Sequence, residues 1–142
     1  MDMTQRKLPH LHPITVHFPQ ALYPVALASQ GVFIYSGSLL FESGAYIALL
    51  FGVLATPFCM ATGFVDWKLR YKGAMTRVFK IKISGSVLVL LFAVLALTVR
   101  MLNPQIPADP LHGPGLLYVA FLTACTTSCV VVGHYGGRLV FH

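Results

Sequence analysis

The sequence predicts an all-α membrane protein, an up-down bundle of four transmembrane helices with both termini in the cytoplasm. The first observation is composition: of 142 residues, 56% are hydrophobic and only 10% are charged, whereas soluble domains carry about 25% charged residues. The second is the mean hydropathy of +0.74. Because ten basic and four acidic side chains are too few to cover a water-facing surface, we expect lipid outside, which excludes soluble enzymes and disordered regulators.

Four apolar stretches are long enough to cross a bilayer, which takes about 20 residues in a helix. The segment between the last two holds four prolines, so we expect a loop with little regular structure there. The whole chain, 1–142, reads as a single integral membrane domain without a linker to a second one. The predicted spans cover residues 13–35, 45–67, 78–101 and 116–141.

The basic residues predict the orientation of these spans. Nine of the ten fall on one side of the membrane, and only Arg100 falls on the other. The positive-inside rule therefore puts both termini and the middle loop in the cytoplasm. A basic strip of this kind meets anionic lipid headgroups, so we expect a bilayer partner and no nucleic acid. The nine residues are Arg6, Lys7, Lys68, Arg70, Lys72, Arg77, Lys80, Lys82 and Arg138.

Two histidines, His17 and His134, lie inside predicted spans near the cytoplasmic side. Each is four residues from an anchoring residue, about 6 Å along a helix, so their depths match. The first and fourth helices of an up-down bundle can be neighbours. An ionisable side chain at membrane depth is a candidate functional residue, and two facing imidazoles can hold a haem iron. The alternative is that both histidines only satisfy backbone carbonyls or interfacial water.

The residues around His134 also fit a flat cofactor. Gly133 and Gly137 leave space free of side chains, although their spacing of four equally suits close packing of two helices. Arg138 can pair with a propionate at the membrane edge. Lys80 and Lys82 can do the same from the third span.

Other polar residues give weaker signals. His12 precedes a proline and is a candidate cap of the first helix as well as a candidate ligand. Trp67 reads as an interfacial anchor, and Asp66 either orients a histidine, pairs with Arg138 or is a solvated carboxylate. The three cysteines lie in apolar stretches and read as reduced packing residues. His10 and His142 are expected in solvent.

Three motifs resemble a family of small bacterial membrane proteins of unknown function. The opening H-P-I-T-V-H-F-P at residues 12–19 is similar to the family's H-P-x-x-V-H-F-P. G-F-V-D-W at 63–67 resembles the family's second-span ending, and G-H-Y-G-G-R-L-V-F at 133–141 its closing motif. Such domains sometimes occur fused to Rieske-type iron–sulfur domains.

This resemblance implies a four-helix module of the bacterial cytoplasmic membrane that is associated with redox chemistry, as a b-type haem carrier using His12, His17 and His134. One feature departs from the family: where it tends to place a histidine and, one turn later, an asparagine, this chain has Lys80 and Ser84. A second haem or a shifted ligand pair is therefore in doubt.

The sequence therefore predicts a haem b electron-transfer subunit, with His17 and His134 as metal ligands, that exchanges electrons with quinone or a membrane redox partner. Motifs of stand-alone enzymes, such as a P-loop or H-E-x-x-H, do not occur. Three alternatives stay open. They are a cofactor-free structural or assembly subunit of a respiratory or photosynthetic complex, a quinone site using His17, Tyr23 and Asp66, and magnesium of a chlorophyll in place of haem iron.

Overall fold

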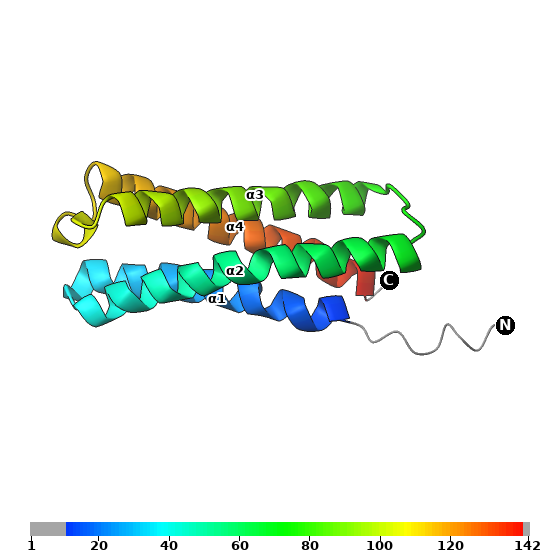
Figure 1. Cartoon of the computed structure of the whole chain (residues 1–142), viewed down its shortest axis with the longest axis horizontal. Helices are drawn as coiled ribbons and strands as arrows, with labels where there is room; N and C mark the ends of the chain where they lie inside the picture. Colours follow the sequence, from blue (N-terminus) through cyan, green and yellow to red (C-terminus); the bar gives the residue numbers. More distant parts are fainter. Residues whose placement is uncertain (1–10, 141–142) are drawn as a thin grey trace.

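The computed structural model describes residues 11–140, which form four long helices in an up-down bundle (Figure 1). No strand occurs within that range. One end of the bundle, here called the proximal end, holds the start of the first helix, the end of the last and the 71–76 turn (Figure 1). The opposite, distal end holds the other two connections. The helices are α1 Leu11–Ser36, α2 Leu39–Arg70, α3 Arg77–Leu102 and α4 Pro114–Val140, with a short 3-10 helix, η2, at Ile106–Ala108.

Three helices, α2, α3 and α4, are long and apolar enough to cross a membrane. The first helix was also predicted as a span, but it is not among these three. Its sequence carries two histidines, two glutamines and three prolines, which lower its hydropathy. With 26 residues it equals α3 in length, about 39 Å at helical rise.

The first turn is shorter than the sequence suggested. Residues 39–44, expected in a loop, are helical and belong to α2. Gly37 ends α1 in the left-handed conformation, with φ of +69°, and its N–H donates to the carbonyl of Phe33 at 2.8 Å, as in an αL cap. The proline-rich 103–113 segment contains only the 3-10 turn η2, as expected for a loop.

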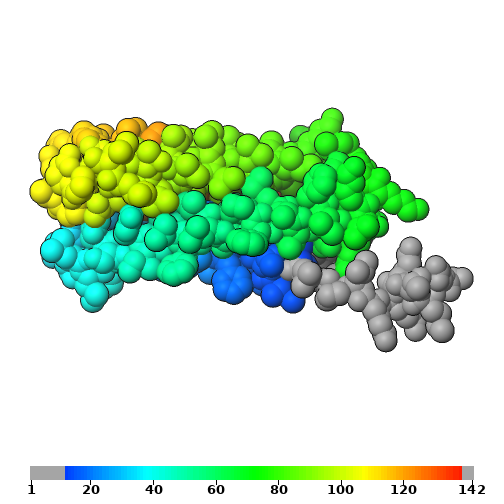
Figure 2. All heavy atoms as spheres, viewed as in Figure 1, coloured from blue at the N-terminus to red at the C-terminus, as the bar shows by residue number. Residues whose placement is uncertain are grey.

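The helices associate as two hairpins, α1 with α2 and α3 with α4. Figure 2 shows both hairpins running side by side along an elongated molecule. Small residues let the backbones approach, and the most deeply buried of these are Ala26, Ala45, Ala93 and Ala96, each 0% exposed. Large apolar side chains such as Phe18, Phe58 and Leu102 instead face outward, as lipid contact requires.

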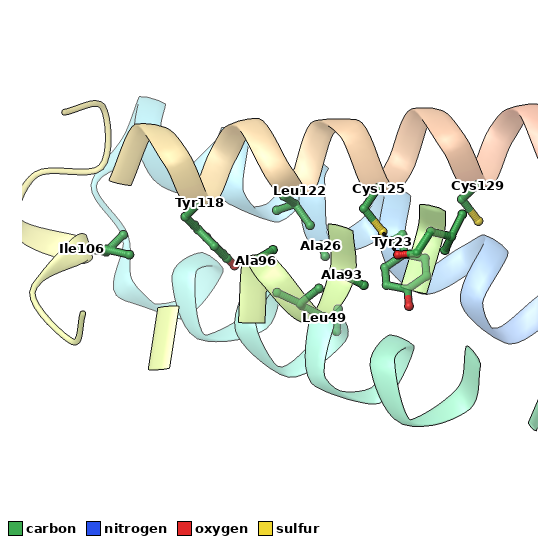
Figure 3. Close-up of a cluster of buried hydrophobic side chains, with 12 residues drawn as sticks. Tyr23, Ala26, Leu49, Ala93, Ala96, Ile106, Tyr118, Leu122, Cys125 and Cys129 are labelled. Carbon is green, nitrogen blue, oxygen red and sulfur yellow. Dashed lines mark hydrogen bonds between the residues drawn. The ribbon is translucent and has the colours of Figure 1, made fainter. Parts of the chain in front are cut away.

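All three cysteines, Cys59, Cys125 and Cys129, are buried and free. Cys125 and Cys129 lie on the inner face of α4 with Tyr23 of α1 between the helices (Figure 3). Their thiols lie 3.5 Å and 3.8 Å from the backbone carbonyls of Val89 and Pro19. The prediction that the three cysteines pack inside the bundle is confirmed.

Candidate functional site

The three sequence motifs meet at the proximal end of the bundle. The first turns of α1, the last turns of α2 and the last turns of α4 all lie there (Figure 1). Helix α3 begins at the same end and adds Lys82. Side chains from α1, α2 and α3 form a polar cluster at this end. We call it the proximal cluster, and it consists of His12, Thr15, Thr62, Asp66 and Lys82.

His12 is the histidine that the structure places inside this cluster. Its ring packs on Gly63, where an added Cβ would lie 2.9 Å from Cε1 of His12. Its Nδ1 lies 3.4 Å from the hydroxyl of Thr62, which also pairs with the hydroxyl of Thr15 at 2.9 Å. Thr15 donates back to the His12 carbonyl. The opening and second-span motifs thus join through direct contacts.

Lys82 brings a positive charge to the cluster from α3. It is half-buried, and its Nζ would lie 3.8 Å from a Cβ at Gly136. Its charge interacts with that of Asp66, and both interact with His12. Lys80 is exposed, because two residues along a helix rotate a side chain by about 200°. Of the two lysines that the sequence suggested, Lys82 is the one turned inward.

Asp66 pairs with Arg70 rather than with Arg138 in this structure. Its carboxylate lies 3.7 Å from Nε of Arg70, one turn later on α2. The guanidinium of Arg138 instead lies over the ring of Tyr135, with 5.7 Å between Cζ and the centroid. Trp67 donates from Nε1 to the carbonyl of Ala74 at 2.9 Å, so the indole also fixes the 71–76 turn.

An open groove runs along the contact between α1 and α4. Its volume is about 230 Å³, and its lining is Gln20, Cys129, Val130 and Gly133. The missing side chain at Gly133 admits the amide of Gln20. At Gly137, one turn further, a Cβ would meet nothing within 4 Å. Gly133 thus permits a close contact with α1, as the packing alternative expected, whereas Gly137 leaves open space.

His17 and His134 are exposed, and both lie on outward faces of the bundle. The register of α1 on α4 places them close to the same level, because Pro19 contacts Cys129 and Tyr23 contacts Thr126. Each lies about 100° around its helix from the α1/α4 contact, given 3.6 residues per turn. The structure thus does not bring the two rings together inside the bundle. Neither residue is among those that line the α1/α4 groove, although His134 directly follows Gly133, which does.

Metal-ligating side chains are otherwise sparse. Within residues 11–138, no group of three or more histidine, cysteine, aspartate or glutamate side chains could hold a metal ion. His112 lies at the distal end, paired with Asp109 at 2.7 Å. His10, His142, Arg6 and Lys7 lie outside the described residues.

The sequence analysis missed a second polar region at the distal end. Glu42, assigned to a loop, is helical and forms an ion pair of 2.6 Å with Arg100. The apolar L-L-F before Glu42 was the available signal that helix α2 starts early and carries this carboxylate into the bundle. Thr62 was also missed, because nothing in one sequence indicates which helix faces His12.

Together the fold and the proximal cluster define a small helical membrane protein with a polar site at one end of its bundle. The chain belongs to a family of this class: the model of the predicted membrane protein family DUF2231 matches residues 8–142. The predicted membership of a membrane protein family of unknown function is thereby confirmed. Comparisons with curated proteins and with solved structures gave no match.

Proposed function

We propose that this chain is a haem b electron-transfer subunit of the bacterial cytoplasmic membrane. The observation that supports the proposal is the register of α1 on α4, which puts the exposed side chains of His17 and His134 near one level. An imidazole at membrane depth is a costly residue that needs a functional reason. Imidazole is also the usual axial ligand of b-type haem.

The residues of the groove fit a porphyrin on its lipid-facing side. Gly137 leaves open space on α4 one turn beyond the close contact of Gly133 with Gln20. Arg138 lies one turn beyond His134, at the proximal end, where a propionate would reach water. When bound, the haem supplies one-electron chemistry, while the chain supplies ligands, position and charge. His12 is held by Thr62 and Gly63, so we assign it a structural role beside the groove.

The electron partners follow from this location. A groove open to lipid admits a quinone from the bilayer, and the basic proximal end suits an acidic redox subunit in the cytoplasm. The crossing of the bilayer by α1 is part of the proposal, supported by its extended packing on α2.

A pyridine haemochrome assay on the purified protein tests the proposal. We expect a haem b band in the wild type and its loss in His17→Ala or His134→Ala, because each removes an axial ligand. His112→Ala is the matched control, since this histidine lies at the distal end with Asp109. Absence of haem after haem-replete expression would overturn the proposal. So would a band that both histidine variants retain.

A second function is favoured by the outward direction of the same two histidines. Side chains that face away from the bundle can contact a neighbouring subunit, and large apolar side chains such as Phe58 and Leu102 surround the molecule. The chain would then be a structural or assembly subunit without a cofactor. Co-purification with a large respiratory or photosynthetic complex, together with a negative haemochrome assay, would favour this function.

A further inference from the structure

The distal half of the bundle contains a polar region to which every helix contributes. Helix α1 provides Gln30, α2 provides Glu42, α3 provides Arg100 and α4 provides Tyr118. Three of these residues are buried: Gln30, Glu42 and Tyr118. Polar and charged groups are costly at this depth in a membrane protein, so their convergence requires an explanation.

The Glu42–Arg100 ion pair anchors the region. The Nε of Arg100 donates to Oε1 of Glu42 at 2.6 Å, and the two side chains are 15% and 7% exposed. Tyr46 lies under the guanidinium, with 5.3 Å between Cζ of Arg100 and the ring centroid. Tyr118 is close enough to interact electrostatically with both Glu42 and Arg100. The buried hydroxyl of Tyr118 therefore lies in the same polar region as the Glu42–Arg100 ion pair.

Two members of the region lack partners. Among the described residues, the buried side-chain nitrogen and oxygen atoms without a hydrogen bond are Nε2 and Oε1 of Gln30 and the hydroxyl of Tyr118. An unmatched buried polar group costs the free energy of its lost hydration, and native proteins satisfy nearly all of them. That all three atoms belong to this region points to a ligand between them.

Gln30 and Tyr118 lie at matching heights in the bundle. Ser29 contacts Gly44, which puts Gln30 level with the Glu42–Tyr46 turn of α2. Gln30 also shares the inner face of α1 with Tyr23 and Ala26, at helical spacing. Because Thr126 contacts Tyr23, antiparallel register places Gln30 level with the turn of α4 that holds Tyr118.

Apolar side chains close the region on both sides. Ile106 of η2 is 2% exposed and lies at the distal end beyond Tyr118 (Figure 3). Towards the proximal end, a layer of buried apolar side chains separates Tyr118 from Tyr23 and the cysteines (Figure 3). That layer consists of Ala26, Leu49, Ala93 and Leu122. Buried apolar side chains therefore bound the polar region at both ends.

We propose that this region is an internal hydration site, in which ordered water links Gln30 and Tyr118 to the Glu42–Arg100 pair. Water both donates and accepts, as the amide and the hydroxyl require, and a buried water typically makes about three hydrogen bonds. The apolar layer separates this water from the proximal cluster.

A double-mutant cycle of unfolding in detergent tests the water link. Gln30→Leu and Tyr118→Phe each remove a hydrogen-bonding partner of the water at nearly constant volume. We expect both variants to lower the unfolding midpoint, and the double variant to lower it by less than the sum. Tyr23→Phe is the control, because its hydroxyl has a protein partner, Thr56, at 2.6 Å. Additive effects, or midpoints that stay equal or rise, would overturn the proposal.

The wild-type protein provides a second measurement that does not depend on variants. In lipid bilayers, water-edited solid-state NMR should transfer magnetisation from water to the side-chain amide of Gln30. It should not reach the methyl groups of Leu49 and Leu122 on the same timescale, because they form the dry layer. A Gln30 amide as slow as these methyl groups would overturn the proposal, whatever the outcome of the haem assay.

Discussion

Single glycines decide how closely the side chains of α1 approach the neighbouring helices. Gly52 faces the ring of Tyr23, Gly63 faces the ring of His12 and Gly133 faces the amide of Gln20. In each case a polar or aromatic side chain of α1 occupies the volume that a Cβ would need. The small residues thus position polar groups as well as backbones.

Replacing Gly52 tests this role. In Gly52→Ala the new Cβ would lie 2.6 Å from Cε1 of Tyr23, a ring that is 0% exposed and bonded to Thr56. We expect a loss of about 1–3 kcal/mol in the free energy of unfolding, as in other overpacked cores. Gly31→Ala is the matched control, because its Cβ meets nothing within 4 Å. It should gain a few tenths to about 1 kcal/mol from helix propensity. Equal effects in the two variants would contradict the packing argument.

At the scale of elements, the bundle consists of two hairpins that are joined by specific polar contacts. The α1/α2 hairpin is held by Tyr23–Thr56 and Thr15–Thr62. Between hairpins, Thr126 of α4 donates to the carbonyl of Tyr23, and Arg100 of α3 pairs with Glu42 of α2. Inside a membrane such contacts fix which faces meet, because apolar side chains do not distinguish helix surfaces from lipid.

The Glu42–Arg100 pair should therefore be costly to break. Glu42→Gln leaves the guanidinium of Arg100 without a charge partner in a largely buried position. We expect a loss of about 3–5 kcal/mol, typical of removing one member of a buried pair, measured by denaturant titration in detergent. The exposed pair of Asp109 with His112 provides the control, and His112→Ala should change stability little. A loss as small as in the control would show that water screens Arg100 fully.

At the scale of the whole molecule, composition and apolar runs were enough to predict a four-helix bundle, because lipid contact demands them. They did not predict which faces meet. The inner face of α1 is set by Pro19, Tyr23, Ala26 and Gln30, and His17 falls outside that face. The depth of a residue in the membrane can be estimated from its position along one helix, whereas the direction of its side chain depends on which helices pack beside it. This is why the level of His17 and His134 could be inferred from sequence while their direction could not.

The charged residues show the same difference between position in the sequence and direction of the side chain. Lys80 and Lys82 are equivalent in a count of basic residues, yet one is exposed and the other approaches Gly136. Glu42 reads as a loop residue because Gly37 and Gly44 flank it, but α2 begins at Leu39 and carries it inward. Arg100, the basic residue predicted on the opposite side, is thus neutralised by Glu42.

Because Glu42 neutralises Arg100, the two ends of the bundle differ more strongly in exposed positive charge, and this difference should orient the bundle in the membrane. With Arg100 paired inside, the basic residues of the described chain that are free to meet headgroups lie at the proximal end, among them Lys68, Lys72 and Lys80. Lys and Arg close to helix ends favour the cytoplasm, so we expect the proximal end to face it.

A reporter enzyme that works only outside the cytoplasm should be inactive when fused after His142. The same reporter should be active when inserted at Ala108, in the distal loop. A cytoplasmic fluorescent reporter should give the reverse pattern. An active export reporter at the C-terminus would contradict this orientation and place the proximal end outside. Arg138, where we expect propionates to reach water, would then also lie outside.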